Sequence, residues 1–99
     1  MALQTVRPPT RDPREPSQHS LSPLRVAGQT IHLFLTIWCD DGGAWRGRLR
    51  FTDDEEPRRV RRTADIFCGS SEDEVWNAVH RLREHHLRDL YQSLDWTDA

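Results

Sequence analysis

The sequence predicts an α+β domain in which a three-stranded antiparallel meander packs on one long C-terminal helix, in the order β-β-β-α, behind a disordered N-terminal tail. Apolar and polar residues alternate with a period of two in residues 30–39 and again in 45–51, as is typical of strands. After residue 71, apolar residues recur at helical spacing. The residues before the first strand are rich in proline and lack either period.

The N-terminal 28 residues carry five of the six prolines, among Arg, Ser, Thr and Gln. Such a segment buries too little apolar surface to offset the entropy that it loses on ordering. We therefore expect residues 1–28 to be a disordered, Pro-rich tail and residues 29–99 to form a single α+β domain.

The first two strands are expected to form a hairpin around residues 41–43. Residues that lie opposite each other in an antiparallel pair share a face of the sheet. A two-residue turn would set the apolar Ile37 opposite Arg46, whereas a three-residue loop sets Ile37 opposite Gly47. The second register keeps one face apolar, and it requires Gly43 to adopt the left-handed conformation that glycine allows. We predict the three-residue loop.

Residues 60–68 predict a third strand, which follows an acidic loop that ends at Pro57. Alternation places Ala64, Ile66 and Cys68 on its inward side. The same alternation turns Arg62 inward, so we expect either that its side chain reaches solvent from the strand end or that the strand begins one or two residues later.

A single helix is predicted from residue 71 to residue 92 or 93. Ser71 and Glu74 have the spacing of a capping box, and acidic residues fill the first turn. The apolar stripe that should face the sheet consists of Val75, Val79, Leu82, His86 and Leu90. His86 stands at the centre of this stripe and is expected to be partly buried with one hydrogen bond.

The opposite face of the sheet carries the candidate partner-binding residues, which are Phe34, Trp38, Arg46, Arg48, Arg50 and Arg61. Trp, Phe and Arg together are typical of the centres of protein interfaces, so a protein partner is our leading interpretation. The same side chains are suited to stacking on bases and contacting phosphates, which makes nucleic acid the alternative. Symmetric self-association through this face or through the edge of the first strand, and simple shielding of the rings by the arginines, are also consistent with the pattern.

Composition limits the partners. The net charge of -2 provides no global positive field that would attract nucleic acid or an anionic membrane. No apolar run is long enough to span a bilayer, so we expect no membrane contact. Cys39 and Cys68 form no Cys-x-x-Cys pair and are expected to be buried thiols of a cytoplasmic protein.

Catalytic and metal-binding patterns are weak. The chain has no Gly-x-Ser-x-Gly motif and no glycine-rich phosphate loop. His80 with Glu84, and His85 with Asp89, stand four residues apart, but the two pairs point in different directions and each lacks a third ligand. We expect no enzyme activity, no cofactor and no metal site. The sequence predicts a small non-enzymatic binding or regulatory module.

Overall fold

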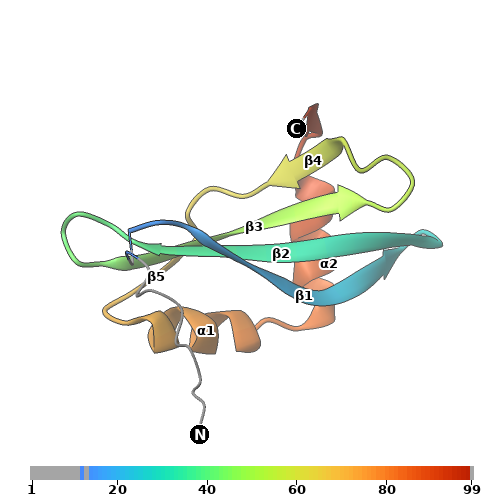
Figure 1. Ribbon diagram of the computed structural model, residues 1–99. Coiled ribbons are helices and arrows are strands. Elements are labelled where there is room, and N and C mark those ends of the chain that lie inside the picture. Colours follow the sequence, from blue (N-terminus) through green and yellow to red (C-terminus); the bar gives the residue numbers. More distant parts are fainter. Residues whose placement is uncertain (1–11, 13, 99) are drawn as a thin grey trace, which may run out of the picture.

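The computed structural model describes residue 12 and residues 14–98, which form an antiparallel sheet with two helices (Figure 1). The strands are β1 (Ser17–Val26), β2 (Gln29–Cys39), β3 (Trp45–Asp53), β4 (Arg59–Arg62), β5 (Phe67–Gly69) and β6 (Thr97–Asp98), and the helices are α1 (Glu72–His80) and α2 (Glu84–Ser93). The strand order is β1-β2-β3-β4-β6, and β5 pairs with β3. The α+β class is confirmed, but the prediction of three strands and one long helix is wrong.

The hairpin between β2 and β3 has the predicted register. Ile37 lies opposite Gly47, and Gly43 has a φ of 85°, in the left-handed region. The Asp40 carboxylate organises the loop, because its Oδ1 accepts hydrogen bonds from the main-chain N–H groups of Gly42 and Ala44, both at 2.9 Å. Apolar residues of both strands therefore share one face.

The tail prediction is wrong for residues 17–26, which form β1, while residues 1–11 and 13 lie outside the described residues. β1 pairs with residues 29–37 of β2 and is joined to it by a tight turn at Ala27 and Gly28, both with positive φ. Leu24 and Val26 are buried in the core. β1 therefore covers most of the edge of β2 through which self-association is one of the predicted alternatives.

The predicted third strand is divided into β4 and β5, and its predicted inward side is wrong. Phe67 is buried in the core, whereas Ala64, Ile66 and Cys68 are exposed. The pairing with β3 determines which residues face inward. Arg61 lies opposite the core residue Phe51, and Phe67 lies opposite Gly47. Arg61 and Phe67 therefore face inward, and the anomalous Arg62 lies on the outward side, opposite Arg50.

The strand is interrupted because a side chain replaces a main-chain partner. Thr63 donates its N–H to the carbonyl oxygen of Leu49 at 3.0 Å, but the N–H of Leu49 donates to Thr63 Oγ1 at 2.9 Å. That side-chain bond ends the regular ladder of β4, and pairing resumes only at β5.

The predicted single helix is broken between His80 and Glu84. Arg83 is extended, with a φ of -94° and a ψ of 163°, and its N–H donates to His86 Nδ1 at 3.1 Å. His86 is therefore an exposed capping residue of α2, and the prediction that it lies in the core is wrong. The break lets two apolar stripes contact two different regions of the sheet.

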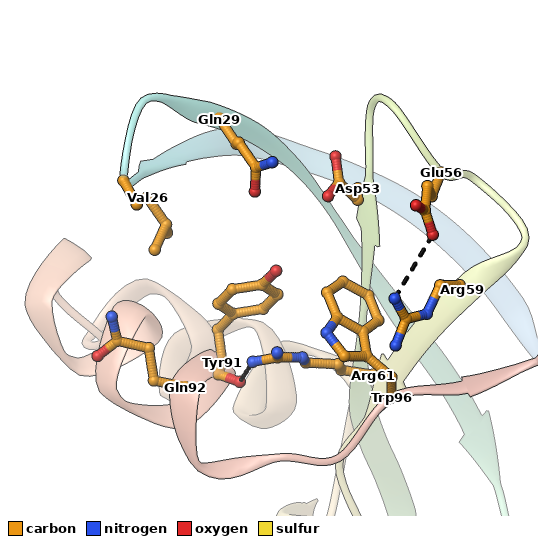
Figure 2. Close-up of a pocket in the computed structure, with 10 residues that line it drawn as sticks. Val26, Gln29, Asp53, Glu56, Arg59, Arg61, Tyr91, Gln92 and Trp96 are labelled. Atoms are coloured by element: carbon orange, nitrogen blue, oxygen red, sulfur yellow. Dashed lines mark hydrogen bonds and ion pairs between the residues drawn. The ribbon is translucent and has the colours of Figure 1, made fainter.

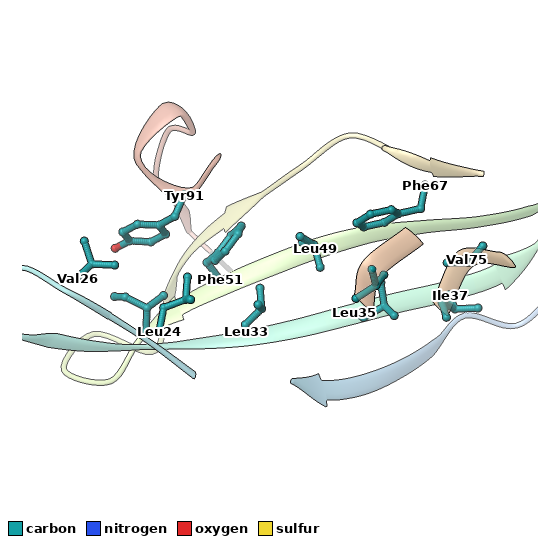
Figure 3. Packing of buried hydrophobic residues seen from close by; sticks show 12 residues of the cluster. Leu24, Val26, Leu33, Leu35, Ile37, Leu49, Phe51, Phe67, Val75 and Tyr91 are labelled. Carbon is teal, nitrogen blue, oxygen red and sulfur yellow. The ribbon is translucent and has the colours of Figure 1, made fainter. Parts of the chain in front are cut away.

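The core lies between the helices and one face of the sheet, which we call the inner face (Figure 3). Its buried members are Leu24, Val26, Ile31, Leu33, Leu35, Ile37, Leu49, Phe51, Phe67, Val75, Val79 and Tyr91. Gly47 allows α1 to approach β3, because a Cβ at that position would lie 3.0 Å from Val75 Cγ1. Tyr91 of α2 packs on Phe51, with 5.4 Å between the ring centroids. Both helices thus lie against the inner face.

Candidate functional site

The opposite, outer face of the sheet brings together five of the six predicted binding residues. β2 and β3 pair Trp38 with Arg46, Thr36 with Arg48, and Phe34 with Arg50. Strand alternation therefore places two aromatic side chains and three arginines on the same side, away from both helices. All five are half-buried, as expected for side chains that lie along the surface of a sheet.

Two arginines of this face lie on the two aromatic rings. The guanidinium carbon of Arg48 is 4.9 Å from the centroid of the Trp38 ring, and that of Arg50 is 4.7 Å from the centroid of Phe34. Guanidinium groups stack on aromatic faces through cation–π attraction, and their N–H groups remain available at the edges. The stacks therefore present hydrogen-bond donors above an apolar layer.

The other contacts of these arginines are with carboxylates. Arg46 Nε lies 2.7 Å from Asp40 Oδ2, and Arg48 Nη1 lies 3.7 Å from Asp65 Oδ1. The hydrogen bond from Arg46 and those from the Ala44 and Gly42 N–H groups hold the pKa of Asp40 below its usual range. The hairpin loop and the outer face are consequently joined through one carboxylate.

Further residues of the outer face were not predicted. Gln18 and Ser20 of β1 lie opposite Thr36 and Phe34 respectively, and Arg62 lies opposite Arg50. Gln18 and Ser20 were missed because β1 was not recognised as a strand. The sequence did contain evidence for Arg62, because a charged side chain conflicts with the inward position that the predicted third strand gave it. Shifting that strand by one residue would have placed it on the outer face.

Arg61, the sixth predicted binding residue, lies on the inner side, and its assignment to the outer face is wrong. Its guanidinium carbon is 4.2 Å from the ring centroids of both Tyr91 and Trp96. Figure 2 shows the three side chains close together. Its Nη1 donates a hydrogen bond to the main-chain carbonyl oxygen of Tyr91 at 2.6 Å. This carbonyl lies in the last turn of α2, so Arg61 stabilises the C-terminal end of that helix.

The two cysteines are free thiols in the structure. Cys39 is half-buried at the end of β2, and Cys68 is exposed on β5 opposite Arg46. The prediction that both thiols are buried is therefore wrong for Cys68.

The described part of the chain contains no cluster of three or more His, Cys, Asp or Glu side chains that is suited to holding a metal ion. None of its helices combines the length and the apolar character that crossing a bilayer requires.

Comparison with known proteins gives no relative from which a function can be transferred. No protein-family model, no curated protein and no solved structure matches the chain significantly.

Proposed function

We propose that the chain is a non-enzymatic binding module whose outer sheet face engages an acidic surface of a protein partner. The observation that carries this proposal is the stacking of Arg48 on Trp38 and of Arg50 on Phe34 on the face opposite the helices. Interface centres are enriched in these residue types, and stacked guanidinium groups are well placed to bind carboxylates bidentately.

A protein is favoured over nucleic acid because the aromatic faces are already covered. A base could stack on Trp38 or Phe34 only after displacing the guanidinium group that lies over the ring. A carboxylate of a partner protein leaves both rings covered, because it binds at the guanidinium edges.

Self-association through this face is disfavoured by its charge. A symmetric pairing would bring the Arg48 and Arg50 side chains of two copies together, and like charges at an interface repel. Light scattering on the purified chain, over a range of concentrations, tests this alternative directly. We further infer a cytoplasmic setting, with which two free thiols are compatible.

The proposal is tested by affinity capture followed by binding measurements with the purified partner. The test variant carries Arg46→Ala, Arg48→Ala and Arg50→Ala. The control carries Arg58→Ala, Arg81→Ala and Arg83→Ala, which removes the same charge from exposed positions away from this face. Capture is repeated after nuclease treatment. We expect a protein that binds wild type and the control, survives nuclease and is lost with the test variant.

Two results would argue against a protein partner. Capture that disappears after nuclease, with an affinity that falls steeply as salt is added, would identify nucleic acid as the ligand. Equal binding of the partner by both triple variants would leave the arginines with a shielding role only.

A further inference from the structure

A cavity on the inner side of the sheet presents a second candidate site, independent of the outer face. It has a volume of about 480 Å³ and lies between the turn that joins β1 to β2, the end of β3, and the C-terminal part of α2. This volume is within the range of small-ligand sites, roughly 300–1,000 Å³. Figure 2 shows the side chains of Gln29, Asp53 and Tyr91 around this cavity.

Asp53 is the unusual group in its wall. It lies on the core side of β3, opposite Ile31, and only 8% of its surface is exposed. One oxygen, Oδ1, accepts a hydrogen bond from the N–H of Glu55 at 2.9 Å. Among the residues that the structure describes, no cationic group lies within ion-pair distance of Asp53, and Oδ2 has no hydrogen-bond donor. Oδ2 is not fully buried, so it can accept a hydrogen bond from a ligand in the cavity.

Arg59 and Arg61 also line the cavity, and both already have partners. Arg61 is held between the Tyr91 and Trp96 rings and donates to the Tyr91 carbonyl. Arg59 lies 3.5 Å from a carboxylate oxygen of Glu56 and 5.0 Å from the centroid of the Trp96 ring. Of the two carboxylates in the lining, Asp53 and Glu56, only Asp53 has no ion pair among the described residues.

Two further oxygen atoms complete a set of three acceptors. The Gln29 amide nitrogen donates to Glu55 Oε2 at 3.1 Å, which leaves the amide oxygen free and, in Figure 2, directed toward the Tyr91 side chain. Burial, which outweighs the opposing effect of Arg61, and the charge of Asp53 both raise the pKa of the Tyr91 hydroxyl, so its oxygen is a neutral acceptor at physiological pH. Val26 and Trp96 add apolar surface to the lining.

We propose that this cavity binds a primary alkylammonium group, with Asp53 as counterion, Gln29 and Tyr91 as further acceptors, and Val26 and Trp96 against the alkyl chain. A primary ammonium group has three N–H donors, which match the three acceptors in number. Its single positive charge compensates that of Asp53. The ligand is either a free alkylamine or the side chain of a lysine in another protein, since both have this chemistry.

The test is a heteronuclear NMR titration of the full chain with three probes: cadaverine, Nα-acetyl-lysine amide, and the same lysine compound with its ε-amine acetylated. We expect saturable shifts at Gln29, Tyr91 and the Trp96 indole with the first two probes and none with the acetylated one. Equal affinities for the first two would identify free alkylamines as ligands, whereas preference for the lysine compound would identify a protein side chain.

Two single variants test whether Asp53 is the counterion of the bound ammonium group. Asp53→Asn keeps an oxygen that can accept from the Glu55 N–H, so the loop is retained, and we expect affinity to fall by at least about tenfold because a charged hydrogen bond is lost. Asp54→Asn removes the same charge from an exposed neighbour that does not line the cavity, and it should bind as wild type does. The arginine triple variant of the outer face should also bind normally.

The proposal is overturned if neither ammonium probe gives saturable shifts, if the acetylated compound binds equally well, or if Asp53→Asn binds like wild type. A melting curve for each variant establishes that it is folded before its affinity is compared. Because the probes act on the inner side, failure here leaves the proposal for the outer face unaffected.

Discussion

Arg61 Nη1 donates a hydrogen bond to the carbonyl oxygen of Tyr91 at 2.6 Å, across the boundary between the sheet and the C-terminal end of α2. Its guanidinium group also packs on the Tyr91 and Trp96 rings, which contact each other edge to face. One side chain therefore links β4, α2 and the C-terminal segment.

Replacing Arg61 with alanine should accordingly destabilise the fold. We expect the free energy of unfolding to fall by about 1.5–3 kcal/mol, the usual range for a hydrogen bond to a charged group. Arg48→Ala, which removes a stacked arginine from the outer face, should cost only about 0.5–1 kcal/mol. Chemical denaturation measures both. If Arg61→Ala cost no more than Arg48→Ala and instead abolished partner binding, our reassignment of Arg61 to a structural role would be wrong.

Gly47→Ala should also destabilise the domain, because the added methyl group would enter the contact between β3 and α1. The new Cβ would lie 3.0 Å from Val75 Cγ1 and 3.4 Å from Leu35 Cδ1. Overpacking of this kind costs about 1–3 kcal/mol. Combining it with Val75→Ala should cost less than the sum of the two single changes. Strict additivity in a double-mutant cycle would show that α1 does not pack on Gly47.

Ala27→Gly should stabilise the hairpin between β1 and β2. Ala27 has a φ of 51°, which strains an L-residue by about 1–2 kcal/mol. The extra freedom of glycine in the unfolded chain offsets about 0.4–1 kcal/mol of the relief. We therefore expect a net gain of about 0.5–1 kcal/mol in thermal or chemical unfolding. A loss of stability would contradict the turn, and with it the pairing of β1.

Asp40 should make stability depend on pH in the acidic range. The pKa of Asp40 is lower in the folded chain than in the unfolded chain. Its contribution to the free energy of unfolding is therefore complete above the unfolded pKa and is lost as the pH falls through the folded pKa. The free energies of unfolding of wild type and of Asp40→Asn should therefore differ most above about pH 5 and converge toward about pH 2. A difference that stays constant over this range would exclude a role for the Asp40 charge.

Trp38→Ala should separate binding from stability. We expect the free energy of unfolding to fall by less than about 2 kcal/mol, because the ring is half-buried on the outer face, whereas Phe51→Ala in the core should cost about 3–5 kcal/mol. Affinity for the protein partner should be lost with Trp38→Ala. A loss of stability equal to that of Phe51→Ala would make Trp38 a core residue.

The β2–β3 hairpin could be predicted from sequence because two independent signals agree. Strict alternation defines the face of each strand, and Gly43 supplies the left-handed residue that the three-residue loop requires. This agreement also explains why Phe34, Trp38 and the arginines of β3 were placed correctly.

β1 could not be recognised from its period, because a bulge interrupts it. The register shifts between Leu21 and Leu24, so residues with odd numbers face inward before the bulge and residues with even numbers after it. Pro23 lies in this bulge, at an edge where proline is tolerated. Most side chains of β1 before the bulge are polar, because β1 is an edge strand. The composition of this segment therefore resembles that of a disordered tail.

The predictions of the third strand and of the single helix failed for a different reason. In both segments the sequence allows two local structures, and contacts with the rest of the fold determine which one forms. Both faces of residues 60–68 carry apolar residues, and only the pairing of Phe67 with Gly47 determines which face is buried. Similarly, His86 fits a continuous apolar stripe but also caps a second helix by accepting a hydrogen bond from Arg83. Side-chain hydrogen bonds of this kind compete with regular helix, and periodicity does not detect them.

The most direct test of the central proposal is photo-crosslinking from the middle of the outer face. Thr36 lies opposite Arg48, between Phe34 and Trp38 along β2, so a photoreactive residue placed there should crosslink to a protein in native lysate. The same residue at Glu84, which is exposed on α2, should not capture that protein. Crosslinking at position 36 alone, and its loss when Arg48 and Arg50 are alanine, is the predicted result. Equal crosslinking from both positions, or from neither, would contradict binding through this face.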